Sequence, residues 1–435
     1  MLRFLMLETV WLLLVKRFRR EKMIELLAPG GNKVKMKTAF DYGADAVYIG
    51  GDVFGLRANA DNFSLDEIAE SVAYADSIGK KIYVTMNIIA RNHDLPEMAK
   101  YAKELSQAGV HGVIISDPGA FMTVKEAAPE LPIHVSTQAN NLNWRTCEWW
   151  QKMGAVRVNL ARELTLNEIR EISKNLKERD CSIELEAFVH GAMCMSFSGR
   201  CMLSDYFVNR SSNRGDCAQP CRWNYKIIET TRPEEILDVE ENDRGTFLFN
   251  SKDLCMLKQL KAFKDAGVNS FKIEGRMKSE FYVAVTVRAY RVALDMIERG
   301  EEIDDEKLNT LLSEVCSVSH RDYCTGFYLG EKGSQIYETS SYKRETDFIG
   351  TVDSCEGDDG EYTLTMTQRG TFSKGDELEF VPASGEIIKY TVGEMKNSAG
   401  EIIERAPHAM MKVTMQVPFK VAEGTVIRRR KAEVK

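Results

Sequence analysis

The chain has 435 residues and a formal net charge of -7, with 44% hydrophobic and 28% charged residues. This balance, with a mean hydropathy of -0.30, is typical of a globular protein and excludes a low-complexity or disordered chain. Ten cysteines over this length are too dilute for a disulfide-stapled secreted scaffold, so a reducing, cytoplasmic compartment is expected. The acidic balance argues against indiscriminate nucleic-acid binding, which depends on Lys and Arg neutralising phosphates. Any nucleic-acid site must therefore be a local patch.

Residues 1–22 form an N-terminal extension, in which an apolar stretch is followed by the basic run Lys16–Arg20. The stretch is too short to cross a bilayer, so no stable membrane span is expected. Its flanks also have the reverse order of a signal peptide. We expect either that translation begins at Met23 or that the extension is a membrane-surface or partner-binding helix.

From Met23 onward one pattern recurs: an amphipathic helix ends at a glycine, and a short β-branched run follows. Clear instances lie at residues 42–50, 108–115, 153–160 and 266–273, and further apolar runs at 24–28, 82–86, 133–135 and 183–189. Alternating strands and helices of this kind predict parallel strands with right-handed crossovers, and eight such units can close a (β/α)8-type barrel. Thr246–Phe249 is a possible ninth strand, or it pairs with Tyr225–Ile228 in an insertion hairpin. An open doubly wound sheet is the alternative architecture.

The same pattern divides the chain into parts. Residues 23–300 are predicted to form the barrel, with a cysteine-rich insertion at 190–250, and residues 301–344 are predicted to be a linker with one helix. After residue 345 the pattern changes to short alternating strands with turn signals. Such a pattern predicts a small C-terminal antiparallel β-barrel over 345–435.

Polar residues follow several of the predicted barrel strands, where barrels of this class carry their chemistry. His190 follows one apolar run, and Glu274 and Arg276 follow another. These three are the candidate catalytic residues, since an imidazole can act as an acid or a base. Elsewhere the simpler interpretation is a helix cap, as at Asp117 and Thr137.

Cysteines are concentrated in and just after the predicted insertion. The five candidate metal ligands are Cys194, Cys201, Cys217, Cys221 and Cys255. Thiolates suit zinc or iron–sulfur clusters, and long irregular separations favour a four-iron cluster over structural zinc, which prefers closely spaced pairs. Four ligands suffice, so one cysteine is spare, and we expect it to be Cys221 because Pro220 and Arg222 indicate a structural turn. The cysteines without cysteine neighbours are expected to be buried small hydrophobic residues.

Arginines give the insertion a positive balance within an acidic protein. Arg200 and Arg214 are the insertion arginines that we expect to bind a ligand, because a guanidinium binds carboxylates and phosphates through two hydrogen bonds. The alternative is a solvated loop.

The sequence resembles the collagenase-like peptidases of family U32. The resembling stretches are Glu25–Gly30, Asp45–Gly50, Glu186–Gly191, Gln219–Arg222, Ser251–Leu254 and Lys272–Arg276. The resemblance extends over nearly everything after Met23. It departs from the family at Ser319–Cys324, where relatives commonly have Asn-Arg-Gly before the Thr-Gly-Phe found here at Thr325–Phe327.

The resemblance implies prephenate-dependent hydroxylation of the tRNA wobble uridine, with a four-iron cluster on cysteines matching Cys194, Cys201, Cys217 and Cys255. On this hypothesis, arginines such as Arg57, Arg162 or Arg276 hold the carboxylated co-substrate over the barrel mouth. The tRNA docks across the insertion and the C-terminal domain, whose basic end at 428–431 meets phosphate, and an electron-donor protein is a further partner. The family name suggests a peptidase as the alternative, and a noncatalytic scaffold that binds a partner through residues 345–435 is a third hypothesis.

Overall fold

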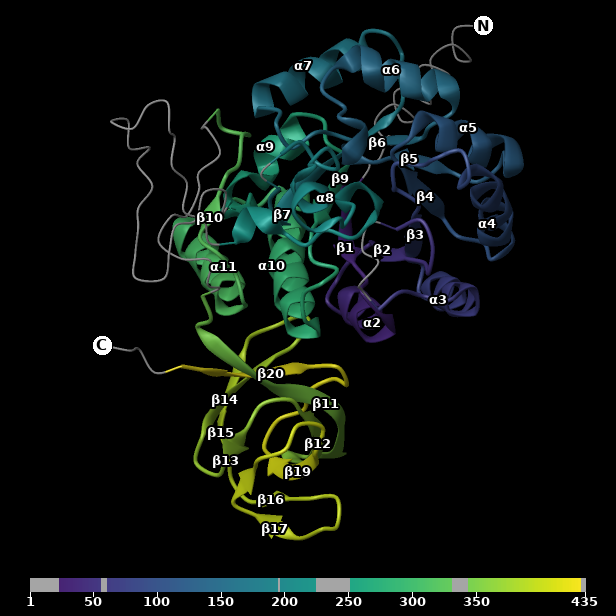
Figure 1. Cartoon of the computed structure of the whole chain (residues 1–435). Helices are drawn as coiled ribbons and strands as arrows, with labels where there is room; N and C mark the ends of the chain where they lie inside the picture. The colour runs from purple at the N-terminus through teal and green to yellow at the C-terminus, as the bar shows by residue number, and fades with distance from the viewer. Residues whose placement is uncertain (1–22, 56–60, 195, 224–250, 331–342, 432–435) are drawn as a thin grey trace, which may run out of the picture.

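The structure is a computed structural model that describes residues 23–55, 61–194, 196–223, 251–330 and 343–431. It has two parts, a barrel surrounded by helices and a smaller β-structure beside it (Figure 1). No helix in these described ranges is long and apolar enough to cross a membrane.

Eight parallel strands form the barrel. They are β1 (Glu25–Pro29), β2 (Ala46–Gly50), β3 (Lys81–Thr85), β4 (Gly112–Ile115), β5 (Ile133–Val135), β6 (Arg157–Asn159), β7 (Glu184–Ala192) and β9 (Ser270–Ile273). Strands β1 to β7 pair in sequence order, and β9 pairs with both β7 and β1, which closes the ring. The eight-stranded parallel barrel predicted from the sequence is therefore confirmed. The possible ninth strand at 246–249 and its hairpin partner lie outside the described residues.

Helices surround the barrel in chain order (Figure 1). They are α2 (Lys33–Asp41), α3 (Leu65–Ser77), α4 (Leu95–Gln107), α5 (Pro118–Ala127), α6 (Trp144–Met153), α7 (Leu166–Lys177), α9 (Leu260–Asp265) and α10 (Glu280–Glu298), with short 3-10 turns η1 (Thr137–Ala139) and η4 (Leu257–Gln259). Their ends follow local chemistry: α3 and α7 begin at the capping boxes of Ser64 and Thr165, and α6 ends at Gly154, whose φ of 100° suits glycine.

The segment predicted to be a linker contributes to the barrel sheet. It contains α11 (Asp305–Ser317) and β10 (Tyr323–Cys324). Strand β10 pairs in parallel with β8 (Asp253–Cys255), and β8 pairs antiparallel with β7. A fully buried ion pair lies beside this pairing: Nη2 of Arg321, two residues before β10, is 2.8 Å from Oδ1 of Asp253 in β8. Part of residues 301–344 is thus packed into the barrel domain.

The C-terminal part is an antiparallel half-barrel. Its main sheet runs in the order β15 (Ile388–Thr391), β14 (Glu377–Val381), β20 (Val426–Arg430), β11 (Thr346–Asp358), β12 (Glu361–Gln368), β19 (Lys412–Val417), β16 (Met395–Lys396) and β17 (Ile402–Ile403), and β13 (Phe372–Ser373) pairs with β18 (Arg405–Ala406). It encloses its own core, which includes Leu364, Phe380 and Ile427. The predicted change to antiparallel strands near residue 345 is therefore observed.

The half-barrel packs against helices of the barrel. Val381 and Val426 belong to the barrel's hydrophobic core. The hydroxyl of Tyr42, just after α2, donates to the carbonyl of Val381 over 2.7 Å and accepts from the amide of Val426 over 2.9 Å. From α10, Arg288 donates to the carbonyls of Pro382 and Gly385. The two parts therefore share one buried interface.

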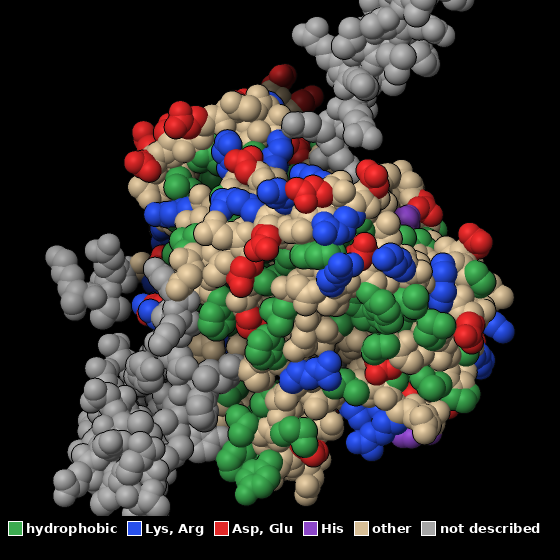
Figure 2. All heavy atoms as spheres, turned by 90° about the horizontal axis from the view of Figure 1, so that it is seen from above, with side chains coloured by type: hydrophobic (Ala, Val, Ile, Leu, Met, Phe, Trp, Pro, Cys, Tyr) green, Lys and Arg blue, Asp and Glu red, His purple; other side chains and the backbone are tan. Residues whose placement is uncertain are grey.

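The face covered by α6 and α7 shows scattered Lys and Arg side chains with hydrophobic side chains between them (Figure 2). Trp149 of α6 is 45% exposed.

Candidate functional site

Arg276 lies at the carboxyl end of the barrel, three residues after β9, and is buried. Its Nη1 donates to Oγ1 of Thr85, the last residue of β3, over 2.9 Å. A Cβ atom on Gly50, the last residue of β2, would lie 2.4 Å from Nη1. A side chain at this position would displace the guanidinium, so Gly50 leaves room for Arg276 and Thr85 holds it at the barrel mouth.

Glu274 lies directly after β9 and is held by two tyrosines. The hydroxyl of Tyr48 donates to its Oε2 over 3.0 Å, and the hydroxyl of Tyr282 donates to its backbone carbonyl over 3.0 Å. Gly191 of β7 approaches so closely that a Cβ atom would lie 2.4 Å from this carbonyl oxygen. The structure thus places Glu274 and Arg276, two of the three predicted catalytic residues, together at the barrel mouth.

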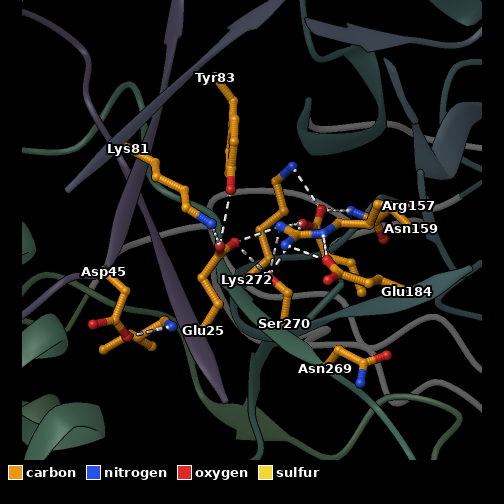
Figure 3. A network of polar contacts seen from close by, with 12 residues as sticks. Glu25, Asp45, Lys81, Tyr83, Arg157, Asn159, Glu184, Asn269, Ser270 and Lys272 are labelled. Carbon is orange, nitrogen blue, oxygen red and sulfur yellow. Dashed lines mark hydrogen bonds and ion pairs between the residues drawn. The ribbon is translucent and has the colours of Figure 1, made fainter. Parts of the chain in front are cut away.

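Deeper in the barrel, charged side chains form a buried network (Figure 3). Arg157, the first residue of β6, contacts Glu25 and lies 2.7 Å from Glu184. Lys272 Nζ lies 3.1 Å from Glu186 Oε1. Burial alone would raise the pKa of Glu25, but the charge and hydrogen bonds of Arg157 outweigh burial and lower it.

This network starts at the amino ends of the strands, since Glu25, Arg157 and Glu184 are each the first residue of a strand. In barrels of this class, residues at the amino ends of the strands usually contribute to stability, whereas catalytic residues lie at the carboxyl ends. Breaking a buried pair leaves an uncompensated charge, so loss of one partner in this network should destabilise the barrel.

His190, the third predicted catalytic residue, is only 1% exposed. Its Nδ1 lies 3.2 Å from the hydroxyl of Tyr290 and its Nε2 lies 3.5 Å from that of Tyr323. Burial lowers its pKa to about 3, so the imidazole is neutral at physiological pH. These contacts hold His190 in the buried core, and its catalytic role stays a prediction.

The cysteine-rich insertion extends across the mouth from β7. Its described residues form α8 (Leu203–Val208), η2 (Ser212–Arg214) and η3 (Pro220–Arg222), and α8 lies in front of the barrel (Figure 1). Near the end of β5, Gly199 approaches Gln138, because a Cβ atom there would lie 3.0 Å from Gln138 Cγ. Beyond β3, the amide of Ile89 donates to the carbonyl of Asn213 over 3.1 Å.

One ion pair fastens this insertion. Arg214 donates two hydrogen bonds to Asp94, of 2.7 and 2.9 Å. The hydrogen bonds from Arg214 lower the pKa of Asp94 to about 2. Arg214, predicted to bind a ligand, is thus engaged in anchoring the insertion, and Asp94 was missed because nothing in the sequence marks it as a distant partner.

Three of the candidate thiols lie close enough to Cys221 for their charges to act on it. Burial raises the pKa of the Cys221 thiol, and the charges of Cys194, Cys217 and Cys201 act in the same direction, against the neighbouring Arg222. Cys194 is exposed, and the other three are half-buried. Cys221, expected to be spare, therefore lies among the other insertion cysteines.

Cys255 has different neighbours. It lies in β8 opposite His190, and its Sγ is 3.8 Å from the Tyr290 hydroxyl. Burial raises its pKa to about 11. Over the described residues, no three His, Cys, Asp or Glu side chains are close enough together to hold a metal ion. The soft thiol donors of the insertion nevertheless fit the chemistry of an iron–sulfur cluster.

The other predicted ligand-binding arginines occupy different environments. Arg162 donates to the carbonyl of Ala192 over 2.8 Å and lies 3.9 Å from the ring centroid of Phe188. Arg200 is exposed. Arg57 lies outside the described residues.

The expectation that the basic end at 428–431 meets phosphate is wrong for Arg428, and it stays a prediction for the residues after it. Arg428 is fully buried and lies 2.6 Å from Glu379. Arg430 pairs with the same carboxylate over 3.0 Å, and Arg429 lies 2.7 Å from Asp376. All three belong to β20 and are engaged by acidic side chains, because a strand within a sheet brings its side chains against neighbouring strands.

Fold and site together define a class: an eight-stranded parallel barrel with a cysteine-rich loop across its mouth and a C-terminal β-domain. The family model for peptidase family U32 matches residues 31–338, and the model for the family's C-terminal domain matches residues 344–428. The chain belongs to peptidase family U32.

Several relatives are named for RNA modification. The chain is 39% identical over 415 residues to tRNA hydroxylation protein P1 of Bacillus subtilis (strain 168), covering 94% of this chain and 96% of that protein. It is 36% identical over 437 residues to tRNA hydroxylation protein P of Escherichia coli (strain K12), covering 91% and 94%. A 23S rRNA 5-hydroxycytidine synthase of Escherichia coli (strain K12) is 39% identical over 280 residues, covering 64% of this chain and 40% of that protein.

Proposed function

We propose that this protein takes part in the prephenate-dependent hydroxylation of the wobble uridine of tRNA, which forms 5-hydroxyuridine. The observation that carries this proposal is the 39% identity, over 94% of the chain, to a protein named for tRNA hydroxylation. A relative named for hydroxycytidine formation in rRNA supports RNA hydroxylation more broadly.

The barrel mouth supplies groups suited to a carboxylated co-substrate. Arg276 is proposed to bind a carboxylate of prephenate, because a guanidinium held in place by Thr85 meets a carboxylate in a defined orientation. Replacing the hydrogen on C5 of uridine by a hydroxyl group is a two-electron oxidation: a two-electron oxidant supplies the oxygen atom, the C5–H bond breaks as the C5–O bond forms, and the hydrogen leaves as a proton. The carboxylate of Glu274, oriented by Tyr48, is the proposed acceptor.

The insertion is proposed to hold a four-iron cluster. Cys194, Cys201 and Cys217 are the proposed ligands, and the fourth is either Cys221 or Cys255. When bound, such a cluster supplies one-electron transfer, with an electron-donor protein as its partner. Anaerobic iron and sulfide analysis of single Cys→Ser variants tests the site. We expect iron to be lost in each of the first three variants and in one of the last two, whereas stoichiometric zinc would contradict the cluster.

The activity is tested in a strain that lacks the endogenous hydroxylation proteins. Mass spectrometry of tRNA nucleosides should detect 5-hydroxyuridine with the wild-type chain and lose it with Arg276→Gln. Arg299→Gln is the matched control, since among the described residues that exposed arginine pairs with its near neighbour Glu301, and it should retain the product. Absence of 5-hydroxyuridine with the wild-type chain would contradict the proposal.

The family description favours peptidase activity as a second candidate. It predicts cleavage of gelatin that stops when His190 is replaced. However, His190 is buried, and its pKa of about 3 makes it a weak base at neutral pH. Gelatin cleavage by the wild-type chain that is lost in His190→Gln would favour the peptidase over the hydroxylation protein.

A further inference from the structure

The insertion exposes an unusual number of aromatic side chains. Among the described residues, five aromatic side chains are exposed to solvent, and four of these lie between residues 197 and 223. We call Phe197, Tyr206, Phe207 and Trp223 the aromatic platform; they are 42%, 82%, 47% and 38% exposed. Large aromatic side chains grouped on a surface are typical of a binding site.

Three members of the platform adjoin one another. The ring centroids of Tyr206 and Phe207 on α8 are 5.4 Å apart, and those of Phe207 and Trp223 are 6.2 Å apart. The helix beneath them is fixed, because Ser204 is fully buried and its Oγ accepts a hydrogen bond from the amide of Ala218 over 2.9 Å. The platform therefore presents its rings on an anchored element, which reduces the conformational entropy lost when a ligand binds.

The charge around the platform favours an anionic ligand. Residues 194–223 contain four arginines and two aspartates, although the whole chain has a net charge of -7. Arg210 and Arg214 are engaged by Asp216 and Asp94. Arg200 is exposed, and no ion pair or side-chain hydrogen bond involves it in the described ranges, so it is available to a phosphate.

Exposed aromatic rings beside arginines match the chemistry of unpaired RNA. Bases that are not paired offer flat faces for stacking on aromatic side chains, and the phosphates between them attract arginine. A fully paired duplex hides those faces. We propose that the aromatic platform binds unpaired bases next to the nucleotide that enters the barrel mouth, an inference that rests on the proposed function.

The test compares a fluorescein-labelled anticodon stem-loop RNA with a fully paired duplex of equal length. Affinities of the full-length chain are measured by fluorescence anisotropy at fixed salt. Tyr206→Ala and Phe207→Ala should each weaken stem-loop binding by about 5- to 150-fold, the range for one lost base stack, and leave duplex binding unchanged. Trp149→Ala is the matched control, because Trp149 is similarly exposed but lies on α6, and it should bind like the wild type.

Each outcome decides the inference. Equal losses of affinity for the stem-loop and the duplex would overturn the inference, and so would wild-type affinity in both α8 variants. Either result is compatible with tRNA hydroxylation by the wild-type chain, so it leaves the proposed function standing. If the variants instead dissociate a dimer, as seen by sedimentation, the platform is a contact between copies of the chain. Absence of both RNA binding and 5-hydroxyuridine with the wild-type chain would overturn the platform together with the proposed function. Thermal unfolding shows whether each variant folds. If Tyr206→Ala fails to fold, Tyr206→Leu replaces it.

Discussion

Breaking the pair between Arg214 and Asp94 should release the cysteine-rich insertion from the barrel mouth. The pKa of Asp94 is held at about 2, against an ordinary value of 3.8, chiefly by hydrogen bonds from Arg214. That difference corresponds to about 2.4 kcal/mol. Because the Arg214 side chain is 29% exposed, solvent screening leaves roughly 1.5 kcal/mol.

A loss of this size in Arg214→Gln should raise the population of the released insertion by about tenfold. Hydrogen–deuterium exchange measures the release directly, at the amide of Ile89, which donates to the carbonyl of Asn213 in the docked insertion. We expect this amide to exchange about tenfold faster in the variant. The folded pKa lies below the unfolded one, so the pair contributes fully above about pH 4 and its contribution is lost as the pH falls towards 2.

Arg210→Gln is the matched control, because Arg210 pairs with Asp216 inside the same insertion and makes no ion pair with the barrel strands or helices in the described part of the chain. Its exchange at Ile89 should match the wild type. Equal exchange rates in Arg214→Gln and the wild type would refute the anchoring role of the ion pair.

Three further changes test other parts of the structure. Gly50→Ala places a methyl group 2.4 Å from Arg276 Nη1. Hydroxylation of tRNA should therefore fall as in Arg276→Gln, and full activity would contradict the close packing of these two residues. Arg428→Ala leaves the buried carboxylate of Glu379 with Arg430 as its remaining partner. Urea denaturation should therefore show a loss of up to about 3 kcal/mol in the free energy of unfolding, which Glu379→Ala partly restores in the double variant. His190, with its pKa lowered to about 3 by burial, stays neutral in the fold while the unfolded imidazole gains a proton. The free energy of unfolding should therefore fall as the pH drops from about 6.5 towards 3. The fall should be steeper than in His190→Gln by up to about 1.4 kcal/mol per pH unit. Parallel curves of unfolding free energy against pH for the two proteins would exclude burial of a neutral imidazole.

Local patterns in the sequence were enough to predict the barrel, because most of its strands are short apolar runs, and β1 to β7 each lie beside their neighbours in sequence. Asp117 caps α5 as expected, whereas Ser136 rather than Thr137 caps η1. Strand ends also identified Glu274 and Arg276 as residues of the barrel mouth.

Pairings between distant segments could not be predicted in the same way. The aspartate that fastens Arg214 is 120 residues away in sequence, and the tyrosines around His190 come from α10 and β10. The basic run of β20 looked like a phosphate site because sequence shows charge but not the acidic strand residues that pair with it. Which cysteine is spare likewise depends on how the insertion folds in three dimensions.

The hydroxyl of Tyr42 bridges two adjacent strands of the half-barrel, one at Val381 and the other at Val426. A fragment that ended at residue 330 would expose this tyrosine together with the apolar surface that those valines cover. The boundary between the two parts is therefore visible in the sequence but is not a place where the folded molecule divides cleanly. During evolution, exchange of one part for another would require Tyr42 and its contacts to change together.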